Sequence, residues 1–376
     1  MPLPSGAAAL VALVAALATA CAAAAAPRRP PLPVAELLLV GFRGTAVEGN
    51  EEVRRLVCDV RVGGVILFER DVATGTAKNI ESAAQVAALT SDLQALAKRC
   101  AGRPLFVAAD AEGGRVMRLS ARAGYLPSPS AEELGLGGDL AATELEARRM
   151  GATLRDAGIN WNLAPVVDVA VNPTNPAVVA LGRTFSADPQ QVIAHARAFI
   201  LGMHEAGVLT SLKHFPGHGS SRQDSHAGFT DVTDTADLDV ELLPYRALIA
   251  QGLADSVMTA HVYNRGLDPW DPATLSRYTV NRILRGRLGY RGVVVSDDLL
   301  MGAIIKHYGI EDAAVKALGA GVDVLLISQN TAKGESRAVD RVIAAVNRAV
   351  TQGWLSRSRV GQALDHVRAL RARLRP

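Results

Sequence analysis

Eight short apolar runs, separated by longer stretches of helical periodicity, occupy most of this chain. Most runs are continuously apolar rather than alternating, which is typical of strands covered on both faces. They lie at residues 36–42, 62–69, 104–110, 159–169, 208–215, 255–262, 292–298 and 322–328. Eight strands alternating with helices over about 330 residues predict an α/β fold, a single (β/α)8 barrel of the TIM type. A doubly wound open sheet has the same alternation and remains the alternative.

One of the intervening helices has clear signals at both ends. Asp188 followed by Pro189 predicts an N-cap and a first helical residue, and Gly207 stands where a C-terminal cap is expected. The apolar face between them consists of Val192, Ala196, Phe199, Ile200 and Met203. After the eighth run only about fifty residues remain, including a basic helical pattern at 357–375, so we expect no second domain.

The first 35 residues differ in composition from the rest. The run LVALVAALATACAAAAA at 10–26 is apolar and rich in small residues, and the stretch PRRPPLP follows it. We therefore predict an export or lipoprotein signal at 1–26, a linker at 27–35 and one folded domain at 36–376. LATAC resembles a bacterial lipoprotein cleavage box, which would place a lipid anchor on Cys21. A plain signal peptide is the alternative.

Either signal predicts an exported protein, periplasmic or attached to the cell envelope; a cytoplasmic protein is the less favoured alternative. The three cysteines show no zinc-type spacing. Without Cys21, an even pair remains, Cys58 and Cys100, which an exported protein could oxidise to a disulfide. Two buried free thiols are the commoner arrangement, and we favour them here.

The charge balance argues against a nucleic-acid partner. The chain has 40 basic and 37 acidic residues, and aromatic residues make up only 4%. This composition offers neither a strongly basic face nor a surface on which bases could stack. We therefore expect no nucleic-acid partner.

Ionisable residues follow five of the eight runs. Active groups collect at the carboxyl ends of parallel strands in both candidate folds, so these residues predict one shared pocket. They are Asp110, Asp168, Lys213 with His214, His261, and Asp297 with Asp298.

The densest polar stretch is KHFPGHGSSRQDSH, residues 213–226. His214 and His218 are four residues apart, as in some metal sites. Pro216 and Gly217 between them are incompatible with a helix that would present both imidazoles on one face. We therefore expect no metal here.

The end of the same stretch is better suited to proton transfer. Asp224 and His226 are two residues apart in a glycine- and serine-rich loop, where the carboxylate can orient the imidazole and raise its basicity. A solvated loop in which this spacing is accidental is an equally good interpretation of these residues alone.

The strand ending in VVVSDD offers a carboxylate at a rigid position. Asp297 can point at a substrate carbon, whereas Asp298 can cap the helix that follows. Adjacent side chains point in different directions, so at most one of the two acts on a substrate.

The segment DAEGGRVMRL, residues 110–119, follows another strand. Asp110 can accept two sugar hydroxyls, and Arg115 and Arg118 can donate to oxygens. The alternative is a structural loop in which Glu112 pairs with these arginines. The segment lacks the phosphate-loop pattern GxxxxGK[ST].

In combination these motifs resemble the family 3 glycoside hydrolases. They are, in order, DAEGGRVMRL, LAPVVDV, LGRTF, KHFPGHG-x4-DSH, MTAHV and SDDLLMGAI, within about residues 35–350. The SDD motif without a second domain is similar to the β-N-acetylhexosaminidase branch, whereas β-glucosidase relatives typically carry SDW and take a Glu from a second domain. The resemblance implies a (β/α)8 catalytic domain with no cofactor and no metal. It also implies a monomer that acts on a small molecule or an oligosaccharide in peptidoglycan recycling.

The resemblance also implies roles for single residues. Asp297 corresponds to the nucleophile, His226 to the general acid/base and Asp224 to its supporting carboxylate. The residues that correspond to substrate contacts are Asp110, Arg118, Arg183, Lys213 and His214. These roles imply a retaining, exo-acting β-N-acetylglucosaminidase that works by double displacement.

Two other functions are compatible with the same residues. One is a phosphorylase in which phosphate replaces water, because a neutral histidine does not repel phosphate. The other is a non-catalytic sugar-binding lipoprotein of the cell envelope, although a binder has no need of a nucleophile opposite an acid.

The chain departs from its relatives in three loops. Asp71 stands in LFERD where an Asn is usual, NPAVVA precedes LGRTF without the usual acidic residue, and GFTDV follows DSHA where relatives have a Leu-Pro. These departures concern linkage preference and loop position rather than the type of reaction.

Overall fold

The computed structural model describes residues 32–225, 228–330 and 337–374. The predicted signal at 1–26, with Cys21, lies outside the described residues, as does most of the predicted linker at 27–35. Within the described ranges, no helix is both long and apolar enough to cross a membrane.

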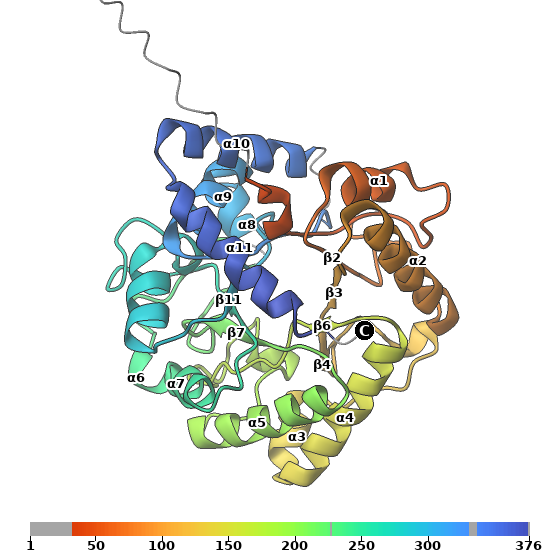
Figure 1. The fold of residues 1–376 in the computed structure, drawn as a ribbon. Coiled ribbons are helices and arrows are strands. Elements are labelled where there is room, and N and C mark those ends of the chain that lie inside the picture. The colour runs from red at the N-terminus through yellow and green to blue at the C-terminus, as the bar shows by residue number, and fades with distance from the viewer. Residues whose placement is uncertain (1–31, 226–227, 331–336, 375–376) are drawn as a thin grey trace, which may run out of the picture. The chain divides into compact units, whose positions relative to one another are not determined.

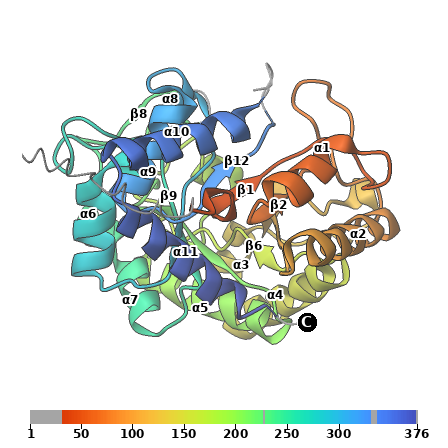
Figure 2. The same ribbon diagram turned by 45° about the horizontal axis from the view of Figure 1, so that its top comes forward.

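Each of the eight apolar runs contains a strand (Figures 1 and 2). The eight strands are β1 (Leu38–Val40), β2 (Gly64–Ile66), β3 (Phe106–Ala109), β6 (Trp161–Asn162), β7 (Ser211–Phe215), β9 (Ser256–Thr259), β11 (Val293–Val295) and β12 (Leu325–Ile327). Short additional strands lie at the loops: β4 (Ala111–Gly113), β5 (Val116–Met117), β8 (Thr230–Asp231) and β10 (Val262–Tyr263).

The eight strands pair in parallel and in chain order. Five form the sheet β12-β1-β2-β3-β6, and three form the sheet β11-β9-β7. Isolated parallel bridges, Trp161↔Leu209 and Val295↔Val324, connect the two sheets at both junctions. Because β12 lies beside β1, the order is that of a (β/α)8 barrel, which confirms this prediction over the open sheet.

Helices connect the strands and surround them (Figures 1 and 2). The longer ones are α2 (Ala83–Ala101), α4 (Leu140–Asp156), α5 (Pro189–Glu205), α7 (Leu243–Ala250), η6 (Tyr278–Arg287), α9 (Gly309–Ala320), α10 (Ala338–Gln352) and α11 (Arg357–Arg371). The shorter ones are η1 (Val34–Leu37), α1 (Glu51–Arg54), η2 (Arg55–Val60), η3 (Ala121–Ala123), α3 (Ala131–Gly137), η4 (Val179–Leu181), α6 (Leu238–Glu241), η5 (Ala273–Leu275) and α8 (Gly302–Ile305).

The helix α5 begins where its sequence predicts, and its C-terminal cap lies one residue before the predicted Gly207. The Asp188 side chain accepts a hydrogen bond from the Gln190 N–H, and Pro189 is the first helical residue. Ala206 caps the other end and is followed by Gly207 at φ +80°, where a residue with a Cβ would be strained. All five predicted apolar residues of its inner face are buried.

Carboxylates lie at the amino ends of three strands, and basic residues of the C-terminal segment pair with each of them. Asp323, which precedes β12, accepts hydrogen bonds from Arg285, Arg359 and His366 at 2.6, 2.6 and 3.1 Å. Asp255 precedes β9 and pairs with Arg373, and Glu36 precedes β1 and pairs with residues of α11. The helix α11 therefore covers this face of the barrel, opposite the carboxyl ends of the strands.

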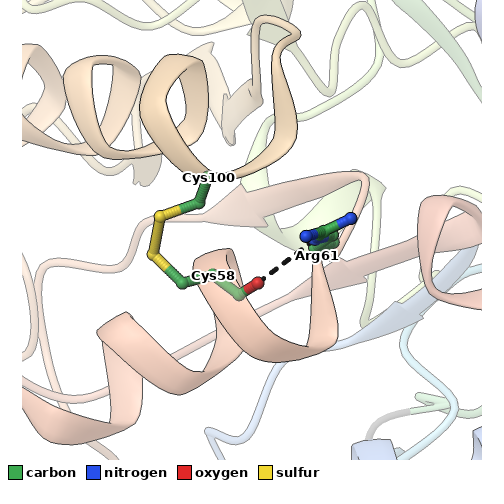
Figure 3. The surroundings of a disulfide bond; sticks show 3 residues. All are labelled: Cys58, Arg61 and Cys100. Atoms are coloured by element: carbon green, nitrogen blue, oxygen red, sulfur yellow. Dashed lines mark hydrogen bonds between the residues drawn. A yellow bond between two sulfur atoms is a disulfide. The ribbon is translucent and has the colours of Figure 1, made fainter.

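Cys58 and Cys100 form a disulfide, so the expectation of two free thiols was wrong (Figure 3). Cys58 lies in η2, Cys100 lies in the last turn of α2, and their Cα atoms are 4.8 Å apart. This distance is within the range for a disulfide. The two cysteines are 42 residues apart in sequence, and only the packing of η2 against α2 brings them together.

Candidate active site

A cavity of about 450 Å³ opens at the carboxyl ends of the barrel strands. Loops after β2, β3, β11 and β12 contribute to its lining, together with β7 itself. Six predicted site residues line this cavity: Asp110, Arg118, Arg183, Lys213, His214 and Asp297. The prediction that polar strand ends share one pocket is therefore confirmed for three strands, β3, β7 and β11.

Lys213 lies at the centre of the charged lining. Its Nζ is 2.9 Å from Asp110 Oδ1 and 2.6 Å from Glu112 Oε1, and its side chain is 2% exposed. Burial alone would lower the pKa of Lys213, but the two carboxylates raise it above its usual value. The ammonium is therefore charged at neutral pH.

Asp110 keeps room for a ligand although both its oxygens have partners. Oδ1 accepts from Lys213, and Oδ2 is 3.3 Å from Arg118 Nη2. Burial would raise the pKa of Asp110, but these two cations hold it below its usual value. Each oxygen of an ionised carboxylate can accept a second hydrogen bond, which suits a sugar hydroxyl.

Arg183 is largely occupied by protein acceptors. Its Nε and Nη2 each donate to Glu112 at 2.8 Å, and its Nη1 donates to the Ala177 carbonyl at 2.9 Å. Nη2 also donates to His214 Nε2 at 3.2 Å. Four of its five N–H donors are thus used within the protein, which leaves at most one for a substrate.

Glu112 was considered in the sequence as a partner of Arg115 and Arg118, and that alternative is wrong. Its partners are Lys213 and Arg183, and its side chain is 3% exposed. Arg118 pairs with Asp110 instead, and Arg115 Nη1 lies 3.5 Å from the Ala180 carbonyl. Sequence reasoning therefore missed Glu112 as a member of the cavity lining.

His214 is held in one tautomer by its neighbours. Because Nε2 accepts from Arg183, the ring hydrogen is on Nδ1, which donates to Asp168 Oδ2 at 2.7 Å. The other oxygen of Asp168 accepts the backbone N–H groups of His214 and His218 at 3.1 and 2.9 Å. Asp168, 1% exposed, thus supports the cavity from behind without lining it.

His218 does not take part in the cavity lining. Its Nδ1 is 2.6 Å from Ser221 Oγ, and its Nε2 is 3.0 Å from Ser225 Oγ. Burial and, to a smaller extent, the nearby His214 lower the pKa of His218 to about 4. This imidazole is therefore neutral and bound to serines at neutral pH.

The loop after β7 is anchored at its base. The Ser220 N–H donates to Glu241 Oε1 at 3.1 Å, and Asn175 Nδ2 donates to the His218 carbonyl at 2.7 Å. A Cβ on Gly217 would lie 2.7 Å from Glu241 Cβ, so this glycine allows the close approach. Asp224 lies further along the loop, and its carbonyl accepts the Gly228 N–H. His226, the predicted acid/base, lies outside the described residues.

Asp297 and Asp298 have different surroundings. Asp297 lines the cavity, and its Oδ1 accepts the N–H of Asp298 at 2.8 Å. Asp298 is bound by Ser328 through both N–H and hydroxyl and by the Leu300 N–H. Burial raises the pKa of Asp298. Asp298 does not cap the following helix, because α8 begins only at Gly302 with Met301 as its N-cap.

The predicted strand-end residue His261 supports this turn from the side. Its Nε2 lies 2.9 Å from the Asp298 carbonyl oxygen, and its Nδ1 lies 2.8 Å from Thr274 Oγ. It contributes to the position of the two aspartates rather than to the lining of the cavity.

The family model described as the glycosyl hydrolase family 3 N terminal domain matches residues 32–370. The chain belongs to glycosyl hydrolase family 3. A curated β-hexosaminidase from Xylella fastidiosa strain M23 is 40% identical over 300 residues, which are 77% of this chain and 83% of that protein. A β-hexosaminidase from Stenotrophomonas maltophilia strain K279a is 36% identical over 340 residues, 86% and 92% of the two chains.

Two solved structures superimpose closely on this chain. A β-N-acetylglucosaminidase of glycoside hydrolase family 3 from Paenibacillus sp. str. FPU-7 has a TM-score of 0.83 and 36% identity, covering 91% of this chain and 62% of that one. A β-N-acetylhexosaminidase from Beutenbergia cavernae has a TM-score of 0.80 and 31% identity, covering 90% and 97%. This family 3 chain is thus a glycoside hydrolase of the β-N-acetylhexosaminidase type, and its substrate is a carbohydrate.

Proposed function

We propose that this glycoside hydrolase is a retaining, exo-acting β-N-acetylglucosaminidase that removes terminal GlcNAc from peptidoglycan-derived fragments of the GlcNAc–MurNAc type. The observation that carries the proposal is that Asp297 shares one cavity with Asp110, Arg118 and Lys213. The cavity volume, about 450 Å³, lies toward the small end of ligand sites, which suits one terminal sugar rather than a long chain.

In the proposed first step, a carboxylate oxygen of Asp297 attacks the anomeric carbon. The bond from that carbon to the leaving oxygen breaks, and His226 gives its proton to the leaving oxygen. In the second step, neutral His226 takes a proton from water, and the water oxygen displaces Asp297. An imidazole with a pKa near 6.5 can perform both tasks at neutral pH. Asp224 would orient it.

The charged lining supports the binding half of the proposal. Asp110 offers acceptor sites to two sugar hydroxyls, and Lys213 and Arg118 present donors on either side of it. Arg183 and His214 have most of their polar atoms bound by protein groups, so we assign them mainly to holding the lining in place.

We further propose that the protein is an exported monomer with its signal at 1–26, a linker to residue 35 and the catalytic domain at 36–376. The Cys58–Cys100 disulfide supports export, because such bonds persist in oxidising compartments. A lipid on Cys21 would attach the enzyme to the cell envelope.

The test is release of nitrophenol from 4-nitrophenyl N-acetyl-β-glucosaminide by wild type and Asp297→Ala. We expect the variant to lose nearly all turnover, and azide to restore part of it with formation of the α-glycosyl azide. The exposed helix residue Asp239 provides the control variant Asp239→Asn. Normal hydrolysis by Asp297→Ala would contradict the assignment of Asp297 as the nucleophile.

Adding phosphate to the same assay separates hydrolysis from phosphorolysis. Release of free GlcNAc both with and without phosphate supports a hydrolase. A sugar phosphate that forms only when phosphate is present indicates a phosphorylase. Sugar binding without any release by folded wild type would indicate the binding protein.

A further inference from the structure

Three rings that are not fully buried lie together at the active-site face: Phe229, Tyr263 and His307. The Phe229 ring centroid is 5.2 Å from that of Tyr263 and 5.8 Å from that of His307. Phe229 is 47% exposed, and His307 is exposed as well. We call these three residues the ring platform. Single exposed apolar residues are common on protein surfaces, but rings in mutual contact form a continuous exposed surface.

Short connections join the ring platform to the turn that carries Asp297. Tyr263 is in β10, two residues after His261, whose Nε2 lies 2.9 Å from the Asp298 carbonyl oxygen. His307 follows Met301 by six residues, and Met301 lines the cavity. Both connections lead to the carboxyl-end face of the barrel, where the cavity opens.

Backbone pairing holds the platform in place. The strand β8, which begins directly after Phe229, pairs in parallel with β10, with Tyr263 opposite Asp231. The Tyr263 hydroxyl donates to the Pro269 carbonyl at 2.9 Å, so this ring has little rotational freedom. Phe229 is therefore a half-exposed ring fixed against two neighbours, not a side chain on a free loop.

We propose that the ring platform binds the leaving-group sugar of the substrate, against the C–H face of its pyranose ring. This inference rests on the proposed glycosidase function, in which the terminal sugar fills the cavity and the rest of the substrate must lie outside it. Aromatic rings that remain partly exposed beside a polar site are suited to a ligand with one apolar face. The platform would thus favour sugar leaving groups over small alcohols.

The test compares kcat/KM for N,N′-diacetylchitobiose with kcat/KM for methyl N-acetyl-β-glucosaminide. Both substrates release an alcohol that must be protonated, so any damage to acid catalysis affects both, and their ratio reports binding of the leaving sugar. We expect Phe229→Ala to lower the ratio about three- to tenfold and Phe229→Tyr to preserve it. Trp354, 77% exposed and two residues beyond the end of α10, provides the control Trp354→Ala with an unchanged ratio.

The ratio could stay unchanged in both Phe229→Ala and the double variant Phe229→Ala/His307→Ala while the methyl glycoside is still hydrolysed. That result would overturn the proposal that the ring platform binds the leaving sugar. Failure of wild type to hydrolyse either substrate would overturn the proposed function itself, and the platform with it. Equal unfolding midpoints of wild type and variants confirm that the comparison concerns folded enzymes.

Discussion

Arg183 and Glu112 form a buried bidentate ion pair, with Nε–Oε2 and Nη2–Oε1 distances of 2.8 Å. They are 71 residues apart in sequence. Glu112 also contacts Lys213 at 2.6 Å, so one carboxylate is shared by two cations. Burial would raise the pKa of Glu112, but the two cations hold it far below its usual range. The pair therefore fixes the position of Lys213 and, through Arg183, of His214.

The first prediction concerns this pair. Glu112→Gln keeps the shape of the side chain but removes the charge that compensates Arg183. We expect the free energy of unfolding to fall by about 3–5 kcal/mol, as for other buried pairs that lose one partner. Urea denaturation measures this. Glu205→Gln, at the exposed pair with Arg148, is the control and should change stability by less than about 1 kcal/mol.

The second prediction concerns Asp168, which accepts three hydrogen bonds behind the cavity. Asp168→Asn replaces one acceptor oxygen by an NH2 group, which must face a donor. We expect kcat to fall about ten- to a hundredfold, corresponding to one lost hydrogen bond to a charged group of about 1.5–3 kcal/mol. Asp188→Asn, at an exposed helix N-cap where Asn serves equally well, should leave kcat unchanged. Equal activity of the two variants would contradict a role for Asp168 in placing His214.

The third prediction is a pH dependence that originates at Glu241. Burial, reinforced by Asp168, raises the pKa of Glu241 to about 7. The folded state therefore binds this proton more tightly than the unfolded chain does. The stabilisation is fully present below about pH 4.3, the ordinary pKa of a Glu, and is lost as the pH rises to about 7.

In Glu241→Gln this titration is absent. The urea midpoint of wild type should decline from pH 5 to pH 7.5 more steeply than that of Glu241→Gln. Asp239→Asn, an exposed position on the same helix α6, should keep the wild-type slope. Parallel slopes for wild type and Glu241→Gln would show that Glu241 does not titrate in this interval.

The fourth prediction concerns the Cys58–Cys100 disulfide. Replacing both residues by serine removes a cross-link that spans 42 positions, and we expect a loss of about 2–4 kcal/mol in the free energy of unfolding. Wild type unfolded in the presence of a strong reductant should match the double variant. If the reductant leaves wild type unchanged and the double variant is as stable as wild type, the cross-link contributes nothing to stability.

Much of the fold follows from local patterns. Spacing over a few residues was enough to predict the eight apolar runs, the N-cap of α5 and the basic helical pattern of α11. The placement of Asp110, Lys213 and Asp297 in one cavity also followed, because strand ends meet at one face of an α/β sheet or barrel.

Long-range pairing could not be predicted in the same way. Glu112 lies near Arg115 and Arg118 in sequence but pairs with Arg183 and Lys213. Which cation lies closest depends on the curvature of the barrel, and no local spacing encodes that. The disulfide is a second case, because its geometry depends on how η2 packs against α2.

The last segment of the chain also completes the charge balance of this barrel. The buried carboxylates of Asp323 and Asp255 take cations from residues 359–373. Without these residues Asp323 keeps Arg285, and Asp255 keeps His204 and Thr210, so each buried carboxylate retains only part of its partners. We therefore expect the barrel to reach its full stability only after its C-terminal residues have docked.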